Sequence, residues 1–325
     1  MTYRHKMLLL SALALLLLGT YSVGPLLTSS DSRRLSPTPW LQNVEADSIT
    51  KIEFLNQEFS LIRNEGKDED NRHSVWSVGL ENEKFPADSN KVEAFADKIA
   101  NLAYYSEADA SRDNWSDFSV DEGNGLKLRI FTSEDDQSQE TIVFGDSLQA
   151  SEHQYARKIS SDTTYVIDDL SRYLESESGY WSDLALFSDE LSIQDVIAIE
   201  FSTEKDGQFR FRRSEDGLNL IKWSLISEEA ALQDVDLETM NRLIRNLIEL
   251  RGEKYATSDE RSYSAIDDPH TTIRFETTRG NTYRLRIGNK NNRQQVYVRS
   301  SYSQYTYLVS EWRINSILNS LQELL

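Results

Sequence analysis

The residues best suited to acid–base or metal chemistry are few and widely spaced. The chain has four histidines, His5, His73, His153 and His270. None has a second possible ligand two to four positions later, which a metal site or a general base with its orienting partner would favour. His5 lies near the start, and the other three fall in predicted loops or at strand edges. We interpret them as ordinary surface histidines.

Carboxylates offer two further hypotheses. The triplets 68–70 (Asp-Glu-Asp) and 134–136 (Glu-Asp-Asp) could attract calcium, but neither has the alternating oxygen ligands and central glycine of a dedicated loop. Solvated hairpin tips are the better interpretation. Asp121 and Asp267 occupy equivalent positions in two halves of the chain. One lies in each half, which favours a repeated turn or cap over a catalytic carboxylate pair.

Motifs of established chemistry are missing from the sequence. It has no glycine-rich phosphate loop, no Gly-x-Ser-x-Gly elbow and no His-Glu-x-x-His helix. It also has no cysteine, which excludes disulfides, thiolate nucleophiles and cysteine-ligated metals. We therefore predict no catalytic, cofactor-binding or metal-ligating residues and no cofactor.

Composition narrows the class of protein. The 325 residues carry a formal charge of −19, 27% are charged and 38% are hydrophobic. Such a chain is long enough for two domains with separate cores. Its charge repels phosphate backbones, so nucleic-acid binding is disfavoured.

An apolar segment opens the chain. Arg4, His5 and Lys6 precede an apolar run from Met7 to Leu18 that extends towards Leu27. Small residues at 22–24 are compatible with signal cleavage, but Pro25 disfavours it. We favour an uncleaved single-pass anchor over residues 1–27, with the N-terminus in the cytoplasm and the bulk of the chain outside, in the periplasm. Residues 28–45 are then a tether.

A long internal repeat organises the remainder. The strand-like segment Lys51–Phe54 precedes Trp76 as Val196–Phe201 precedes Trp223, and both tryptophans and both strands are offset by 147 positions. Tyr155-Ala-Arg157 matches Tyr297-Val-Arg299, and Gly145 matches Gly288. A repeat of this length predicts a duplicated domain. We place the first copy at 46–178, a linker at 179–192 and the second copy at 193–325.

Each copy alternates short strands with one amphipathic helix. Asp88 or Ser89 can cap a helix with Val92, Phe95 and Ile99 on one face, and Asp236 can cap one that ends before Gly252. The fold class is therefore α+β, with two tandem antiparallel sheets, each with a long helix on one face. Strands are predicted at 49–55, 59–63, 74–78, 126–131, 140–144, 154–159, 163–167, 196–201, 208–213, 271–276, 282–287, 295–299 and 305–309, with a short helix at 169–174.

Aromatic residues could instead bind a ligand. Tyr297, Tyr302, Tyr305 and Tyr307 could stack on sugars, but tyrosine at alternate positions is also typical of a half-buried strand. We favour packing. Trp76 and Trp223 are most simply core residues between helix and sheet.

The sequence resembles the domain of unknown function 4340 family in two tandem copies, over about residues 45–320. The resemblance lies in Trp76, Val120-Asp121, Gly145 and Tyr155-Ala-Arg157, and in Trp223, 266–269 (Ile-Asp-Asp-Pro), Gly288 and Tyr297-Val-Arg299. The first copy lacks the proline that the second has at Pro269. Members are similar to extracytoplasmic accessory proteins of ABC-type or gliding-type membrane systems, and the family implies no catalytic residues.

These features lead to one preferred function and two alternatives. We expect a non-enzymatic accessory or scaffold subunit of a membrane complex, related to ABC-type transport, with membrane protein subunits as partners. The first alternative is a module that binds envelope glycans or a small ligand. The second is an unrecognised hydrolase, which would need a cleft that gathers carboxylates with perturbed pKa values.

Overall fold

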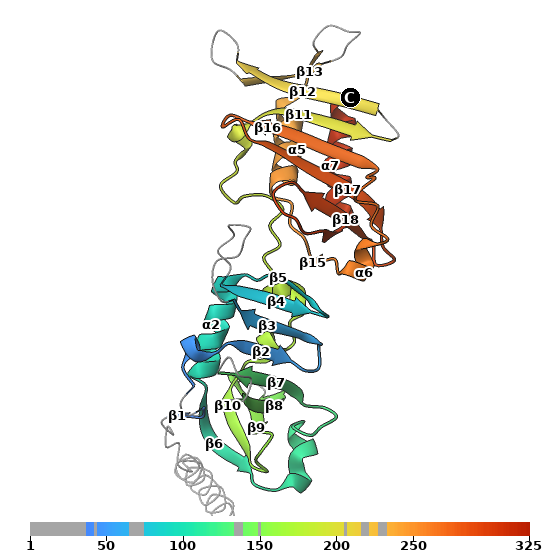
Figure 1. The fold of residues 1–325 in the computed structure, drawn as a ribbon. Coiled ribbons are helices and arrows are strands. Elements are labelled where there is room, and N and C mark those ends of the chain that lie inside the picture. The colour runs from blue at the N-terminus through green and yellow to red at the C-terminus, as the bar shows by residue number, and fades with distance from the viewer. Residues whose placement is uncertain are drawn as a thin grey trace, which may run out of the picture.

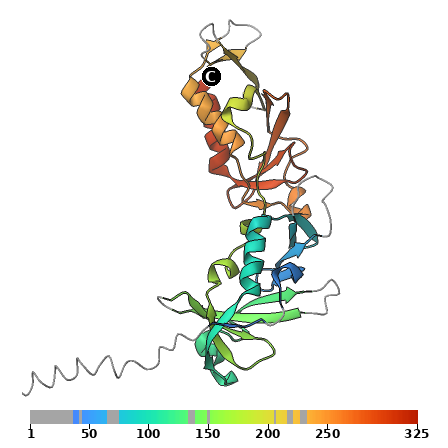
Figure 2. The same ribbon diagram turned by 90° about the vertical axis from the view of Figure 1, so that its left-hand side faces the viewer.

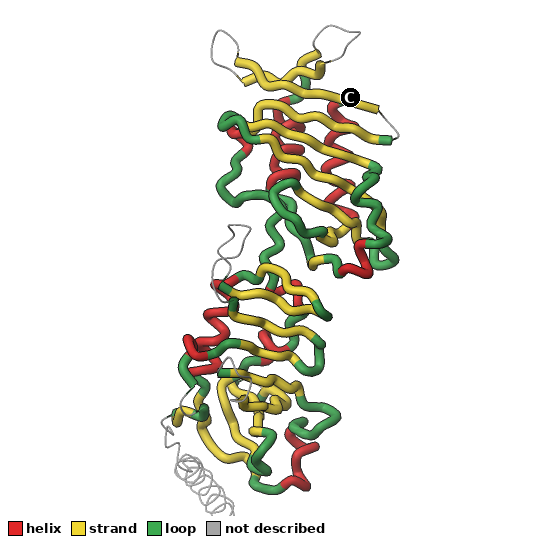
Figure 3. The backbone as a smooth tube through the Cα atoms, viewed as in Figure 1, coloured by secondary structure: helices red, strands yellow, loops and turns green. Residues whose placement is uncertain are grey.

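Two antiparallel sheets follow one another along the molecule (Figure 1). The computed structural model describes residues 37–41, 44–64, 75–132, 139–148, 151–204, 207–215, 221–226 and 233–325. We keep 46–178 and 193–325 as the proposed limits of the two copies, here called the first and second units. Strands dominate both units, with a few helices beside them (Figure 3).

The first sheet has ten strands in the order β1-β6-β10-β9-β8-β7-β2-β3-β4-β5. The strands are β1 (Thr38–Pro39), β2 (Lys51–Phe54), β3 (Phe59–Arg63), β4 (Trp76–Leu80), β5 (Glu83–Pro86), β6 (Ala103–Asp109), β7 (Leu126–Phe131), β8 (Gln139–Ser147), β9 (His153–Lys158) and β10 (Thr164–Asp168).

The second sheet has nine strands in the order β14-β13-β12-β11-β16-β17-β18-β19-β15. They are β11 (Val196–Thr203), β12 (Gly207–Glu215), β13 (Ile221–Ile226), β14 (Gln233–Asp234), β15 (Lys254–Tyr255), β16 (Thr271–Thr277), β17 (Thr282–Lys290), β18 (Gln295–Ser300) and β19 (Tyr307–Ser310). Strands β2 to β10 correspond one by one, in chain order, to strands β11 to β19. Within these two sets, each strand of the first has the same neighbours in its sheet as its counterpart in the second. The two sheets thus share one topology.

One long helix occupies the same place in each unit. Helix α2 (Ser89–Ala100) begins at Asp88, whose carboxylate accepts a hydrogen bond from the Lys91 amide. Helix α5 (Leu237–Ile248) begins at Asp236, which accepts one from the Thr239 amide. Both predicted caps are confirmed. Asx side chains at this position satisfy amides that have no partner within the helix.

Each unit has its own apolar core between sheet and helices. Trp76 and Trp181 are fully buried in the first core together with Phe95 of α2. Trp223 is 2% exposed in the second, which also contains Leu243 and Leu247 of α5. The prediction that Trp76 and Trp223 are core residues is confirmed.

A second long helix in the second unit corrects the prediction of one helix per sheet. Helix α7 (Glu311–Leu324) packs beside α5 along one face of the sheet (Figure 2). Its apolar residues Ile314, Ile317 and Leu321 are buried in the core. Their spacing of three and four positions is typical of an amphipathic helix, so the sequence did contain the signal.

Part of the predicted tether is packed structure. Strand β1 pairs with β6, and Trp40 and Leu41 are buried at 6% and 4% exposure. The tether prediction over 28–45 is therefore wrong for 38–41, because burial of the large Trp40 side chain stabilises this segment on the sheet. The predicted membrane segment 1–27 lies outside the described residues. No helix among those that are described has the length and apolar character needed to span a bilayer.

Smaller corrections concern element ends. Helix α5 ends at Ile248, four residues before Gly252, whose amide bonds to the Leu184 carbonyl instead. The first helix ends at Ala100, and Ala103 already begins β6. Strands β5, β6, β14 and β15 show no clear alternation of apolar and polar residues and were not predicted.

Candidate functional site

A loop in each unit folds over the outer sheet face, opposite the long helix. In the first unit this loop contains η2 (Arg112–Phe118), and it buries Trp115 and Val120 against Val143. Phe118 and Tyr155 pack at its edge, with ring centroids 4.7 Å apart. The result is a small second core on the outer face.

The second unit repeats this arrangement with different side chains. Ile266 packs with Tyr297 and Leu308 in a buried cluster after the short helix α6 (Ser258–Arg261). Tyr297 takes the place of Tyr155, and Ile266 that of Val120. The matching tyrosines therefore serve packing in both units.

Two glycines let the loop approach the sheet closely. A Cβ at Gly145 would lie 1.9 Å from the Phe118 carbonyl oxygen, and one at Gly288 would lie 2.0 Å from that of Ser264. The residues that follow these carbonyls, Ser119 and Ala265, have φ of 55° and 53°. Non-glycine residues adopt this left-handed backbone at a cost, so the contact is held by its surroundings.

The matching arginines differ between the units. Arg157 is 2% exposed, lies 3.6 Å from the Trp115 ring centroid and donates from Nε to the Val120 carbonyl. Burial lowers the pKa of Arg157. Arg299 is only partly buried, with Asp267 at 3.7 Å and the Thr306 hydroxyl within hydrogen-bond distance.

The reason for the difference is a single position. Val120 and Ile266 are 146 positions apart, and the same spacing puts Arg261 where the first unit has Trp115. Arg261 points to the first unit, and the Arg299 guanidinium is left without an aromatic cover.

Edge strand β5 joins the two units. Phe85 is 2% exposed and belongs to the core of the second unit, although it lies in the first sheet. Its ring stacks on Tyr255 with centroids 4.8 Å apart and meets the edge of Tyr305 at 5.7 Å. A buried aromatic cluster thus crosses the junction.

A charged pair lies beside this cluster. Arg261 donates from Nη1 and Nη2 to the two oxygens of Glu83 at 3.0 and 3.1 Å, and the Ser258 amide donates to the same carboxylate at 3.0 Å. Bidentate pairs of this kind fix orientation as well as contributing attraction. These junction residues were not predicted from the sequence, and only the exchange of Trp115 for Arg261 in the repeat could have indicated them.

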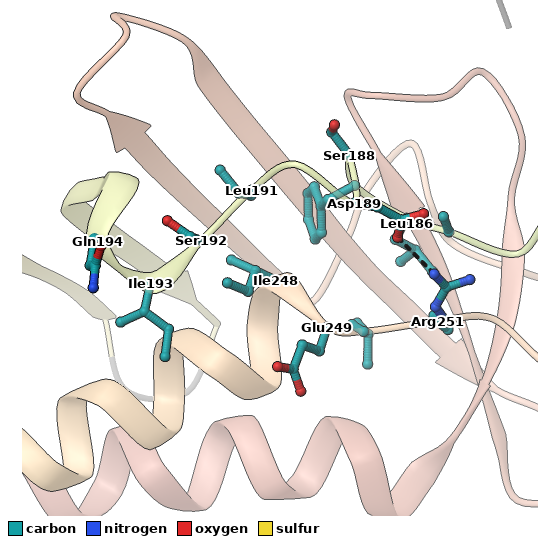
Figure 4. A pocket seen from close by; sticks show the side chains of 13 residues that line it. Leu186, Ser188, Asp189, Leu191, Ser192, Ile193, Gln194, Ile248, Glu249 and Arg251 are labelled. Atoms are coloured by element: carbon teal, nitrogen blue, oxygen red, sulfur yellow. Dashed lines mark hydrogen bonds and ion pairs between the residues drawn. The ribbon is translucent and has the colours of Figure 1, made fainter.

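A groove follows the connecting segment (Figure 4). Its volume is about 490 Å³, and its walls come from residues 185–189 and 191–194 and from residues 248–251 at the end of α5. Asp189 and Arg251 form an ion pair of 2.7 Å at one end, where a second hollow of about 520 Å³ opens towards the start of α2. The rest of the lining mixes leucine, isoleucine and phenylalanine side chains with Ser188, Ser192, Gln194 and Glu249. The groove therefore has both polar and apolar walls.

The described histidines have structural surroundings. His270 contacts Asn289 at 2.8 Å and Glu204 at 3.1 Å, which raises its pKa. His153 packs edge-on against Tyr105 with centroids 4.3 Å apart. The Tyr105 hydroxyl donates to Asp168, which raises the pKa of Tyr105 to about 12.

The predicted carboxylate candidates do not gather. Asp121 accepts hydrogen bonds from the Gly123 amide and from Asn124, which lower its pKa and make it the turn residue that the sequence predicts. Asp267 is exposed and pairs with Arg299 instead. Within the described part of the chain no three His, Asp or Glu residues could together hold a metal ion. His5, His73 and the acidic triplets 68–70 and 134–136 lie outside that part.

The tyrosines near the C-terminus mostly pack. Tyr307 is fully buried and its hydroxyl donates to the Ser303 hydroxyl at 2.9 Å, while Tyr302 is 41% exposed. A more exposed aromatic, Trp312 of α7, is 65% exposed at the edge of a shallow hollow of about 340 Å³. It was not among the predicted candidates.

Comparison with known families gives two overlapping matches. The family described as a domain of unknown function, DUF4340, matches residues 76–269 and again 223–325. The chain belongs to the DUF4340 family. The two matches begin at Trp76 and Trp223, the paired core tryptophans. No curated protein and no solved structure matches the chain.

The DUF4340 matches include the described elements from β4 onwards, and β1, β2 and β3 precede them. The first covers the edge strand β5, the connecting segment and α6, and the second ends with α7. The loop over the outer face and its glycine are thus part of the DUF4340 pattern in both units.

Proposed function

We propose that the chain is a non-enzymatic scaffold subunit of a membrane complex, located outside the cytoplasmic membrane and related to ABC-type transport. The observation that carries this proposal is the junction, where Phe85 and the Glu83–Arg261 pair fix one unit on the other. A scaffold must hold two binding surfaces at a set distance. A buried aromatic cluster with a bidentate ion pair does so, whereas a flexible linker does not.

The roles of the described polar side chains support a structural function. Asp88 and Asp236 cap helices, Asp121 holds a turn, and Glu83 holds the junction. A scaffold needs its carboxylates in such places. The location outside the membrane rests on the sequence of residues 1–27.

Photo-crosslinking in native membranes tests the scaffold proposal. A photoreactive residue is placed at exposed positions on both units, for example at Glu93 and Arg245, and crosslinked proteins are identified by mass spectrometry. We expect the same integral membrane subunit from both positions. A chain without residues 1–27 is the control and should lose this product. Recovery of soluble enzymes alone, or of nothing, would contradict the proposal.

A glycan-binding module is the second candidate, and the exposed Trp312 favours it. This ring lies beside the polar side chains of Gln294, Gln295 and Asn315. An aromatic face with nearby amides is suited to sugar rings. Titration of Trp312→Ala and of the unaltered chain with envelope glycan fragments separates the candidates. Saturable binding that Trp312→Ala abolishes would support the glycan module.

A further inference from the structure

The outer face of the second sheet carries a dense group of basic side chains. In the pairing register, Arg210, Arg274 and Arg284 lie in one row across β12, β16 and β17, with Glu200 of β11 between the first two. Residues directly opposite in a sheet share a face, and so do residues two apart on a strand. The same face therefore includes four more basic residues, Arg212, Lys222, Arg286 and Arg299.

Few carboxylates balance this group. The same face carries Glu200, Glu276, Asp234 and Asp267. Glu276 contacts Arg274 at 3.4 Å and Arg210 at 4.0 Å, and these arginine side chains remain 44% and 47% exposed. Arg212, Arg284 and Arg286 form no ion pair within the described residues.

At two places on this face, two arginines lie directly opposite each other on neighbouring strands. Arg274 faces Arg284, and Arg286 faces Arg299. Like charges at such positions destabilise a sheet. A fold that keeps two of these pairs on an open face gives up stability for a property other than folding, and local departures of this kind are expected at functional sites.

The first sheet provides an internal comparison. It has the same topology, yet the positions that match Arg210, Arg212, Arg284 and Arg286 in register are occupied by Ser60, Ile62, Thr141 and Val143. The counterpart of Arg274 is Arg129, which is paired with Glu53 at 3.3 Å. The matching face of the first sheet still carries basic residues, namely Lys51, Lys84, Lys127, Arg129 and Arg157. The second unit therefore differs in its directly opposed arginines, which the fold itself does not require.

The distribution of charge along the chain strengthens the contrast. Residues 46–178 carry 29 acidic and 13 basic side chains, a formal charge of −16, whereas residues 193–325 carry 20 and 18, a charge of −2. Helices α5 and α7 lie on the opposite side of the second sheet (Figure 2). The loop around Ile266 covers the basic side at β18 and β19, whereas Arg210, Arg212, Arg274 and Arg284 on β12, β16 and β17 are exposed. In an acidic molecule, this face is the surface suited to a negatively charged partner.

We propose that the basic face of the second sheet, built around Arg210, Arg274, Arg284 and Arg286, docks an acidic segment of a partner protein. The proposal rests on the scaffold function in taking the partner to be a protein. Strand β1, the first described strand of the first sheet, lies at the end of the molecule remote from this face (Figure 1). If the N-terminal segment anchors the chain, the face lies away from the bilayer, which disfavours lipid headgroups.

Guanidinium groups also suit this partner chemically. They bind carboxylates through two parallel hydrogen bonds, and neighbouring strands hold adjacent side chains of one row about 4.8 Å apart. An extended acidic chain can therefore meet several of them in succession. Because the face is exposed, binding should weaken with added salt.

A labelled peptide of ten glutamates is the probe for this face. Fluorescence anisotropy measures its binding to the full chain, to Arg284→Gln/Arg286→Gln and to the charge-matched control Arg245→Gln/Arg293→Gln, whose residues are exposed but lie off the face. We expect the face variant to bind at least about tenfold more weakly and the control to stay within about twofold. Raising salt from about 50 to about 200 mM should weaken binding to the unaltered chain.

A stability readout separates docking from folding. Removing one member of each like-charged pair should raise the urea midpoint of the face variant while its binding falls.

Equal loss of binding in both variants would overturn the proposal. So would tighter binding to anionic phospholipid vesicles than to the peptide, or self-association in sedimentation that only the face variant loses. If membrane crosslinking succeeds but the face variant binds normally, the scaffold function stands and this docking surface does not.

Discussion

Gly145 and Gly288 are the residues on which the outer-face loops depend. Each lies where its strand bulges, between Phe144 and Ser147 in the first sheet and between Ile287 and Lys290 in the second. The bulge turns the glycine against a carbonyl of the loop. The backbone itself blocks any side chain there, and a backbone carbonyl cannot move aside as a flexible side chain can.

Alanine at either glycine should therefore destabilise its unit. We expect Gly145→Ala and Gly288→Ala each to lower the free energy of unfolding by about 2 kcal/mol or more, since the added methyl group must displace main chain. Urea denaturation measures the effect. Gly123→Ala is the control, because its nearest contact would be a carboxylate oxygen at 3.3 Å and it should change stability far less. Equal effects at all three positions would contradict this account.

At this scale the sequence identified positions but not their partners. The repeat pointed to Gly145, Gly288 and both Tyr-x-Arg segments without showing that they build one loop contact. Asp121 was correctly predicted as a turn residue because its partners Gly123 and Asn124 are local. Its counterpart Asp267 pairs with Arg299, 32 positions away, and nothing local could indicate that.

Helix α7 is the element with the largest role that sequence reasoning overlooked. It has no capping side-chain hydrogen bond at Ser310, and polar residues interrupt its apolar stripe. The helix is fixed by packing on α5 and on β18 and β19. Tertiary contacts commonly decide such helices, since intrinsic propensity is a weak preference.

Truncation of a buried side chain on α7 tests its part in the core. Ile317 is fully buried, so Ile317→Ala should lower the free energy of unfolding by about 2–5 kcal/mol through lost apolar burial and the cavity left behind. Thermal and urea unfolding give the measurement. Asn319→Ala, two residues later on the exposed side, should stay within about 0.5 kcal/mol. Similar stability of the two variants would mean that α7 is dispensable.

Long periodic elements were predicted well and short ones poorly. Helix α5 begins as expected at Asp236, and β16, β17 and β18 lie close to the predicted ranges because clear alternation marks them. Strand β5 has only four residues and contains Pro86. Its place at the sheet edge depends on contacts with the second unit, and a local pattern carries no record of those contacts.

The junction determines whether the whole molecule behaves as one body. Phe85→Ala together with Glu83→Gln removes the stacked ring and weakens the bidentate pair. We expect the distance distribution between spin labels at Glu93 and Arg245 to broaden about twofold, because the units then move independently. The absence of native cysteines makes selective labelling simple. Double electron–electron resonance spectroscopy measures this distance distribution.

A neighbouring substitution provides the control for the junction. Lys84 lies between the two altered residues and is exposed, so Lys84→Gln should keep the narrow distribution of the unaltered chain. A broad distribution in the unaltered chain itself would remove the basis of the scaffold proposal.

The place of Phe85 also bears on how the protein is made. Its ring finishes its packing only when Tyr305 arrives, 220 positions later in the chain. During synthesis the first unit therefore exposes the Phe85 side chain to solvent until Tyr305 is available. Transiently exposed apolar surface of this kind binds chaperones or incorrect partners. The junction can therefore form fully only after Tyr305 has been synthesised.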